Sequence, residues 1–309
     1  MEPIIAPIAT ELLKSELTAE KLLRKTNKAD NEIYVVNYKN APNVLREIGR
    51  LREESFRPLD CGSGKDCDLD YFDLEDDACQ QLIVWNPEEE DIVGGYRFTI
   101  WADSKIKPNG QPNVNTAHLF NFTEEFVKEE FAHGLEMARA FVQPKYQGRQ
   151  MGRKSIFALD NLWDGIGGLL AKDANLKFMI GKVSVFPSSP EISRNAVIYY
   201  LDKYFKDQKG GLSPKDAVLC TPEQIAEYEA IFGQGTAKEN YIKLNTFVRS
   251  HNDVIPPLIH SYIELSSSMK TYGTAIFEDL GGCIDVCIKI TVADIYPEKY
   301  ERYINSYNA

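Results

Sequence analysis

The sequence predicts an α/β fold with a mixed sheet, in the broader sense that includes α+β arrangements. Segments with helical periodicity alternate with short β-rich runs along most of the chain. The 309 residues are 43% hydrophobic and 11% aromatic, which is enough to bury a substantial core. Length alone allows one large domain or two smaller ones. There is no internal repeat and no low-complexity tract.

The first half of the chain begins with a helical segment, which Thr18 can divide in two. Strands and helices follow. The expected elements are a helix at 8–26, a strand at 32–38, an amphipathic helix at 43–56, strands at 81–85 and 91–101, a polar loop at 103–117 and a helix at 122–131. The two strands flank an acidic turn and predict a hairpin. Gly94 and Gly95 predict a bulge or a close backbone approach within the second strand, or an irregularity of the hairpin.

The second half begins with a strand that leads through a basic turn into a long helix. The expected elements are a strand at 134–142, a helix at 152–171, a strand at 179–186, a helix at 193–205, helices at 221–232 and 254–269, and a strand at 283–292. A Gly- and Pro-containing link at 206–216 precedes the C-terminal third.

Composition excludes several classes of protein. The net charge of -11 argues against a general nucleic-acid binder. No apolar run approaches the length of a membrane span, and the N-terminus lacks the pattern of a signal peptide, so a cytoplasmic location is expected. The six cysteines form no CxxC pair and no histidine lies at zinc spacing, so we expect reduced thiols and no metal site.

Charge is distributed unevenly. The segment 66–91 holds eleven acidic residues and no Lys or Arg, whereas 137–159 holds five basic residues and no acid. A basic segment in an acidic protein suits an anionic ligand or partner. The alternative is a solvated surface at the start of a helix.

The basic turn reads VQPKYQGRQMGRK at 142–154. A strand followed by a Gly- and Arg-containing turn at a helix N-terminus is a common way to hold phosphate. This turn resembles motif A of the GNAT N-acyltransferase superfamily, with Gln147, Gly148, Arg149 and Gly152 at matching positions and Gln150 in place of a glycine. The resemblance implies that the turn binds the phosphate of a pantetheine-bearing acyl donor, with Arg153 beside it. It also implies a bulged strand before the turn, in which an amide near Phe141 or Val142 binds the thioester oxygen.

The segment SRNAVIYYLDKYF resembles a second GNAT motif, with Asn195, Ala196, Tyr200 and Phe205 at matching steps. In the family this tyrosine often protonates the leaving thiolate, a role that falls on Tyr200. Tyr199 competes for the role, and either tyrosine can instead be a core aromatic with a bonded hydroxyl.

Further motifs resemble the acyl-carrier-protein-dependent branch, which contains ornithine- and glycine-type N-acyltransferases labelled hemolysin-like and is related to acyl-homoserine-lactone synthases. The matching residues are Arg52, Phe56, Asp68, Asp70, Asp73, Arg97, Glu136 and Arg139, and the segment PPLIHSYIELSSSM agrees with the amino-acid acyltransferases. The resemblance implies an N-terminal helical extension at 1–30, a GNAT-like core at 31–206 and a C-terminal extension at 207–309 packed on the core.

Acyl transfer to an amine requires removal of a proton from an ammonium group. Glu136 is the candidate base, and the alternative is a structural pair with Arg139. Strict strand alternation puts these two side chains on opposite faces, and a bulge changes that.

The acceptor is expected to meet residues of the Arg and Asp motifs. Asp70 and Asp73 would face its amino group, or order the loop over it. Arg52 and Arg97 would bind its carboxylate, with Arg139 nearby, or would instead be structural partners of the aspartates.

The leading hypothesis is an enzyme that moves a fatty acyl group, 3-hydroxylated or plain, from acyl carrier protein to the amine of an amino acid in amino-lipid synthesis. A loop with fewer glycines and more basic residues suits the single phosphate of a carrier-bound phosphopantetheine better than coenzyme A, and an acidic carrier suits the basic segment. No permanently bound cofactor is expected, and peripheral contact with the inner membrane surface is a further expectation. The alternatives are an acetyl-coenzyme A-dependent N-acetyltransferase, autoinducer synthesis and a non-catalytic lipid-surface or partner-binding protein.

Overall fold

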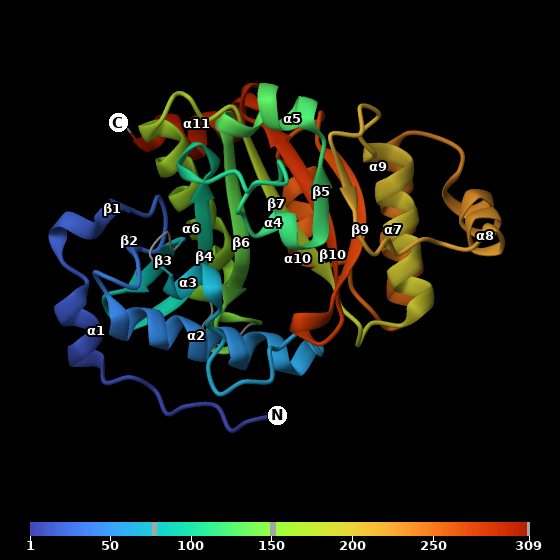
Figure 1. Cartoon of the computed structure of the whole chain (residues 1–309). Helices are drawn as coiled ribbons and strands as arrows, with labels where there is room; N and C mark the ends of the chain where they lie inside the picture. The colour runs from blue at the N-terminus through green and yellow to red at the C-terminus, as the bar shows by residue number, and fades with distance from the viewer. Residues whose placement is uncertain (76–78, 149–152, 308–309) are drawn as a thin grey trace.

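A mixed sheet runs through the centre of the molecule (Figure 1). The computed structural model describes residues 1–75, 79–148 and 153–307, and in that part of the chain the sheet has eight strands. Across the sheet these are β1 (Leu22–Lys25), β2 (Glu32–Val36), β3 (Gln80–Asn86), β4 (Asp91–Ile100), β6 (Gly134–Val142), β7 (Phe178–Val185), β10 (Cys283–Thr291) and β9 (Lys270–Phe277). Neighbouring strands are antiparallel except β6 and β7, which are parallel. The predicted mixed α/β class is confirmed.

Helices lie on both faces of this sheet and against one another. They are α1 (Thr10–Glu16), α2 (Pro42–Phe56), α3 (Tyr71–Leu74), α4 (Thr116–Leu119), α5 (Glu124–Glu129), α6 (Arg153–Lys172), α7 (Glu191–Phe205), α8 (Pro222–Phe232), α9 (Ala237–Ser250), α10 (Pro257–Ile263) and α11 (Pro297–Tyr303). A small ribbon pairs β5 (Phe120–Phe122) with β8 (Leu212–Pro214). Within the described ranges, every helix is too short or too polar to cross a lipid bilayer.

Strand alternation sends different residues of β3 to the two faces. Ile83 and Trp85 pack with the apolar side of α2, whereas Leu82 and Val84 belong to the larger cluster on the opposite face. The apolar positions of α2 recur at helical spacing, and the side chains of Leu45 and Ile48 are fully buried. The apolar residues on the two faces of β3 therefore follow the strand and helix periodicity of the sequence.

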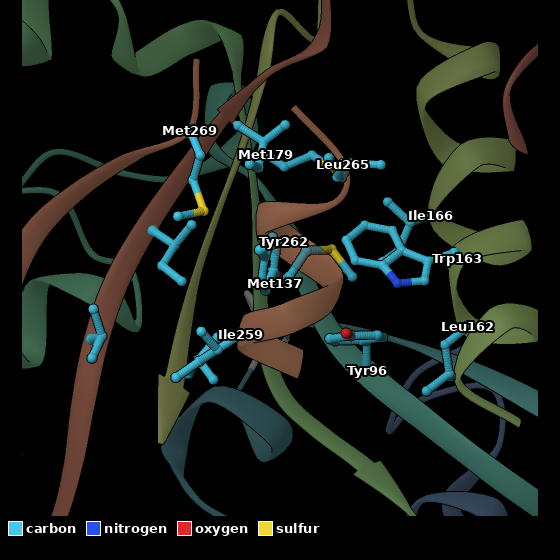
Figure 2. Packing of buried hydrophobic residues seen from close by; sticks show 14 of the residues in the cluster. Tyr96, Met137, Leu162, Trp163, Ile166, Met179, Ile259, Tyr262, Leu265 and Met269 are labelled. Atoms are coloured by element: carbon cyan, nitrogen blue, oxygen red, sulfur yellow. The ribbon is translucent and has the colours of Figure 1, made fainter. Parts of the chain in front are cut away.

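On the larger core face, α10 lies between the sheet and α6 (Figure 2). Tyr262 of α10 meets Trp163 of α6 edge to face, with ring centroids 5.4 Å apart. Met137 of β6 and Met179 of β7 supply the sheet side of the same cluster. The short helix α10 thus covers the place where β6 and β7 run side by side.

The pairing of β4 with β6 contains a bulge. Gly95 faces Phe141 and Arg97 faces Ala138, so Tyr96 alone is opposite Arg139 and Ala140. Arg139 has a φ of 50°, in the left-handed region that non-glycine residues seldom adopt. A Cβ on Gly94 would lie 2.4 Å from the Phe141 carbonyl oxygen, so the strands approach too closely there for a side chain. The glycine pair therefore marks a bulge and a close approach, and the β3–β4 hairpin is also irregular beside Gly94, so each of the sequence-based alternatives occurs.

Some elements differ from the sequence prediction. The helix expected at 8–26 ends at Glu16, and Leu22–Lys25 pairs with β2 as strand β1. The helix expected at 254–269 is confined to Pro257–Ile263. The sequence prediction also lacks α9, β9 and α11. The proposed division at 30 and 206 stays a prediction, and β1, β9 and β10 from outside the expected core all join the one sheet.

The expectation of six reduced thiols is wrong for two cysteines. Cys61, after α2, and Cys283, at the start of β10, form a disulfide that joins positions 222 residues apart in sequence. Both residues are buried. Sequence spacing could not reveal this pair, because only the folded chain brings the two positions together. Cys287 is a free, buried strand residue, as expected.

Candidate functional site

The parallel strands β6 and β7 separate partway along their length. Their pairing runs from Gly134 opposite Phe178 to Met137 opposite Gly181 and ends there. Beyond that point lies a cavity of about 160 Å³, lined by the consecutive residues 138–140 of β6 and 182–184 of β7. Consecutive strand residues point to alternate faces, so a cavity that touches all of them lies in the gap between the strands. The bulge in β6 is the first wall of this gap.

Most of the remaining wall is apolar. It consists of Phe56 at the end of α2, Cys61, Phe186, Pro256, Pro257, Leu258, Phe277, Leu280 and Cys283. The start of α10 therefore faces the cavity on one side, and the end of β9 faces it on the other. Such a wall suits the alkyl portion of a ligand.

The polar part of the wall comes from two adjacent strands together with Asn115 and Arg139. Lys182 and Ser184 of β7 line the cavity together with Asp285 of β10. Ser184 is directly opposite Asp285 in the ladder, and its hydroxyl donates to Asp285 Oδ1 at 2.7 Å. Lys182 donates to the side-chain oxygen of Asn115. Burial lowers the pKa of Lys182, and the nearby carboxylates of Glu136 and Asp285 oppose that shift.

Glu136 lies behind this polar wall and does not contribute to the cavity lining that the structure describes. Its Oε2 accepts from Trp101 Nε1 at 3.3 Å and from the Asn115 amide at 3.2 Å. Its Oε1 accepts from both the amide and the hydroxyl of Thr116, and Lys182 Nζ is 3.8 Å away. Both carboxylate oxygens are thus engaged as acceptors. The alternative pair of Glu136 with Arg139 does not form.

The arginine and aspartate motifs meet in one buried cluster beside the bulge. Arg52 Nη1 lies 3.2 Å from Asp73 Oδ2, and Arg97 Nη1 lies 3.0 Å from the same oxygen. Arg97 also contacts Asp70 at 2.6 Å. The side chains of Arg52, Arg97 and Asp73 are almost wholly enclosed. Arg52 and Arg97 thus pair with the aspartates, and binding of an acceptor carboxylate by these arginines stays a proposal.

Arg139 belongs to the same cluster and also reaches the cavity. Its Nε lies 3.2 Å from Asp68 Oδ2 and its Nη2 lies 3.1 Å from Asp70 Oδ2. Its guanidinium lies over the ring of Phe277, 5.4 Å from the centroid. Because of the bulge, Arg139 and Ala138 both line the cavity. The ion pairs of Arg139 with Asp68 and Asp70 therefore hold the bulge in place from one side.

The two candidate tyrosines of α7 lie away from the described cavity lining. The Tyr200 hydroxyl is buried and donates to the Ala237 carbonyl of α9 at 2.9 Å. The Tyr199 hydroxyl donates to Glu229 of α8. Burial raises the pKa of Tyr199 to about 12, and raises that of Tyr200 further. Both side chains join α7 to the C-terminal helices.

The predicted donor turn is described only in part. Phe141 is buried, and the Val142 carbonyl accepts from Gln147 Nε2 at 2.6 Å and from Ser55 Oγ at 3.2 Å. Gly148 has a φ of 74°, which favours glycine. Arg149 and Gly152 lie outside the described residues, and α6 begins at Arg153. Helix α6 therefore starts where a phosphate-binding turn requires a helix N-terminus.

Sequence reasoning missed the polar residues of the cavity, Asn115, Lys182, Ser184 and Asp285. One signal was present: MIGKVSVF and CIDVCIKI are apolar strands in which charged residues, Lys182 and Asp285, stand among aliphatic neighbours. A charge in the middle of such a strand needs a partner or a ligand. Lys182 and Asp285 come from strands that are about a hundred positions apart in sequence, and their adjacency follows from sheet order, which the sequence does not state.

Comparison with known proteins agrees with this architecture. Residues 51–154 match the family described as acetyltransferase (GNAT) domain. A protein of Bacteroides thetaiotaomicron named glycine N(alpha)-acyltransferase is 41% identical over 307 residues, which cover 99% of this chain and 91% of that protein. A protein of the same name from Phocaeicola vulgatus is 43% identical over 308 residues, covering 99% of this chain and 94% of that protein.

Proposed function

This chain belongs to the GNAT N-acyltransferase family and is an acyltransferase that acts on an amine, and on that premise we propose that its acceptor is the amino group of glycine. The donor in this proposal is a fatty acyl group, 3-hydroxylated or plain, carried as a thioester on the phosphopantetheine of acyl carrier protein. The product is an N-acyl amino acid for amino-lipid synthesis, made in the cytoplasm with peripheral contact at the inner membrane surface. Membership of the family leaves the non-catalytic alternative without support.

The observation that carries the proposal is the cavity between the separated strands β6 and β7. It combines an apolar wall with a small polar wall, as a reaction between a fatty thioester and an amino acid requires. Its volume of about 160 Å³ favours a small acceptor. The names of the two relatives favour glycine among the small amino acids.

Carrier protein as donor is supported by the sequence of the turn after β6. Gln150 stands where the GNAT motif has a glycine, and Arg149, Arg153 and Lys154 surround that position in sequence. A carrier-bound phosphopantetheine has one phosphate, whereas coenzyme A carries a diphosphate and one further phosphate. Basic residues near the turn would also attract an acidic carrier.

Mass spectrometry of reaction products tests the acceptor and the donor together. The purified protein is incubated with pooled amino acids and, separately, with plain acyl carrier protein, 3-hydroxyacyl carrier protein, fatty acyl-coenzyme A and acetyl-coenzyme A. We expect N-acylglycine with the acyl carrier proteins. Turnover with acetyl-coenzyme A alone would identify an N-acetyltransferase and overturn the proposed donor. Acyl-homoserine lactone as product would instead indicate autoinducer synthesis.

A double charge reversal tests the docking of the carrier. We expect Arg149→Glu with Arg153→Glu to weaken binding of acyl carrier protein, because like charges would then face each other. Lys209→Glu, at an exposed site far from the turn in sequence, is the matched control. Unchanged carrier binding in the double variant would remove these residues from the docking surface. Reaction with a free pantetheine thioester should continue in both proteins.

The family resemblance is the source of further proposals, in which Glu136 is the base and Tyr200 is the acid. Asp70 and Asp73 contact the amino group of the acceptor in these proposals, and its carboxylate is contacted by Arg52, Arg97 and Arg139. The contacts described above give each of these residues a structural partner. Variants of these residues therefore need a stability measurement beside each activity measurement.

A further inference from the structure

Building on the proposed function, we propose that Asp285 and Lys182 bind the two ends of the acceptor amino acid, with Asp285 on the ammonium group and Lys182 on the carboxylate. Both side chains line the cavity between β6 and β7. The proposal gives the acceptor a place on β7 and β10, outside the Arg and Asp motifs by which the family resemblance is recognised.

Asp285 is a buried carboxylate that has Lys182 nearby but forms no direct ion pair with it among the described residues. Its side chain contacts the hydroxyl of Ser184, and within the described parts of the chain it forms no ion pair. The residue is only 5% exposed. Buried carboxylates in proteins are normally paired with a cation, since desolvation of an unpaired charge is costly. An ammonium group that enters from the cavity would supply the missing partner.

Lys182 is the corresponding buried cation. Its nitrogen donates to Asn115 and lies 3.8 Å from Glu136 Oε1, which already accepts from Thr116. Burial lowers the pKa of Lys182, so this environment compensates its charge incompletely. A carboxylate that reached Lys182 through the cavity would favour the charged form. Arg139 is less available for that role, because Asp68 and Asp70 already pair with it.

Sheet register places these two groups at a suitable separation. Ser184 is opposite Asp285 and Lys182 is opposite Cys287, so Lys182 and Asp285 are diagonal neighbours on one face. Diagonal side chains in an antiparallel pair start roughly 7–8 Å apart, and one α-amino acid with a hydrogen bond at each end fits between such groups. Of the other charged or titratable groups, Lys182 and Arg139 line this place, whereas Glu136 and Cys287 lie behind the lining and near Lys182.

The chemistry balances without a further reactant. Asp285, in place of Glu136, accepts one proton from the bound ammonium, which leaves a neutral amine. The amine nitrogen forms a bond to the thioester carbonyl carbon, and the carbon–sulfur bond breaks. A second proton from the nitrogen reaches the departing thiolate, and the proton on Asp285 passes to solvent. The products are the N-acyl amino acid, a free pantetheine thiol and one proton.

The role of Asp285 is tested by the pH dependence of Asp285→Asn. The wild-type enzyme uses the abundant zwitterion, so its kcat/KM for glycine should change little across neutral pH. The variant can use only the small fraction of glycine whose amine is unprotonated. Its kcat/KM should therefore fall by about 100-fold at neutral pH and rise about tenfold for each unit of increase in pH. Asp279→Asn, at an exposed site just before β10, is the control and should behave as wild type. A uniform loss without recovery at high pH would overturn the role as proton acceptor.

The role of Lys182 is tested by a pair of acceptors that differ only in the carboxylate. Wild-type enzyme should prefer glycine to glycinamide strongly. Lys182→Met should raise the KM for glycine by about 10- to 100-fold, leave the KM for the donor unchanged and bring the two acceptors close to equal efficiency. Lys209→Met, at an exposed site, controls for loss of a positive charge. A variant that loses activity equally on both acceptors would contradict carboxylate binding.

Failure of this proposal differs from failure of the proposed function. If wild-type enzyme makes no N-acylglycine with any donor, the acceptor assignment is wrong and the variants are compared on the amine that the enzyme does use. If wild-type enzyme makes N-acylglycine and both variants keep wild-type KM, pH profile and acceptor preference, the subsite on β7 and β10 is wrong while the function stands.

Discussion

Arg97 and Asp73 form an enclosed ion pair, with Arg97 Nη1 3.0 Å from Asp73 Oδ2. The same carboxylate also accepts from Arg52 and from the side-chain amide of Gln81. One aspartate therefore joins α2, β3 and β4 beneath the bulge of β6. Burial alone would raise the pKa of Asp73, but Arg97 and Arg52 outweigh that effect and hold the pKa well below its usual range.

Asp73→Asn should destabilise the fold strongly. It leaves two enclosed guanidinium groups without their shared anion, and breaking a buried pair on one side typically costs about 3–5 kcal/mol. Denaturant unfolding measures the change in the free energy of unfolding. The exposed neighbour Glu75 offers the control Glu75→Gln, which should change stability by less than about 0.5 kcal/mol. A difference of that small size for Asp73→Asn would show that the cluster contributes little to stability.

The contribution of Asp73 to the free energy of unfolding should also depend on pH. Because the folded pKa is depressed, the stabilisation is present above the unfolded pKa of about 3.9 and is lost as pH falls below that value toward the folded pKa. The stability gap between wild type and Asp73→Asn should therefore be constant near neutral pH and shrink below about pH 4. Unfolding curves at several pH values measure this gap. A gap that stayed constant down to about pH 2 would contradict the assignment.

Glu136→Gln should reduce stability and turnover together. The carboxylate accepts from Trp101, Asn115 and Thr116, and an amide NH₂ in its place would meet donors instead of acceptors. An unsatisfied buried polar group costs about 1–3 kcal/mol. Thermal unfolding and product formation are measured on the same preparation. Lost turnover at wild-type stability would instead indicate that Glu136 is the catalytic base.

Tyr200→Phe should have a modest effect on both properties. The hydroxyl donates to the Ala237 carbonyl, so its loss should cost about 1 kcal/mol of stability and change kcat by less than about threefold. Tyr199→Phe, one position away on α7, tests the competing candidate in the same way. A much larger loss of kcat in Tyr200→Phe, with normal stability, would support the role of a general acid for the leaving thiolate.

Periodicity and residue type were sufficient to predict the central elements. The strand expected at 134–142 is β6 as it stands, and the helix expected at 43–56 is α2 within one residue. The bulge followed from Gly94 and Gly95 together with the family resemblance. These features depend on local rules, namely the alternation of a strand, the turn of a helix and the space that a glycine leaves.

Features that depend on long-range contacts could not be predicted in the same way. The strand β1 has only four residues, and its pairing with β2 overrides the helical tendency of the preceding segment. The pairing of Arg97 with Asp73 depends on tertiary contacts, and only the fold brings these two side chains together. The sequence could not predict that β10 lines the cavity, because this depends on the sheet order that places β10 beside β7.

That sheet order has a consequence for synthesis of the chain. The cavity needs β6, β7 and β10, and the last of these ends at Thr291, long after the β6–β7 pair has left the ribosome. The parallel half of the cavity can assemble early, whereas Asp285 reaches it only when β10 has docked along β7. Until then the exposed edge of β7 is an unpaired strand, open to wrong partners. A nascent chain would therefore complete this cavity in one late step, after most of its sheet has folded.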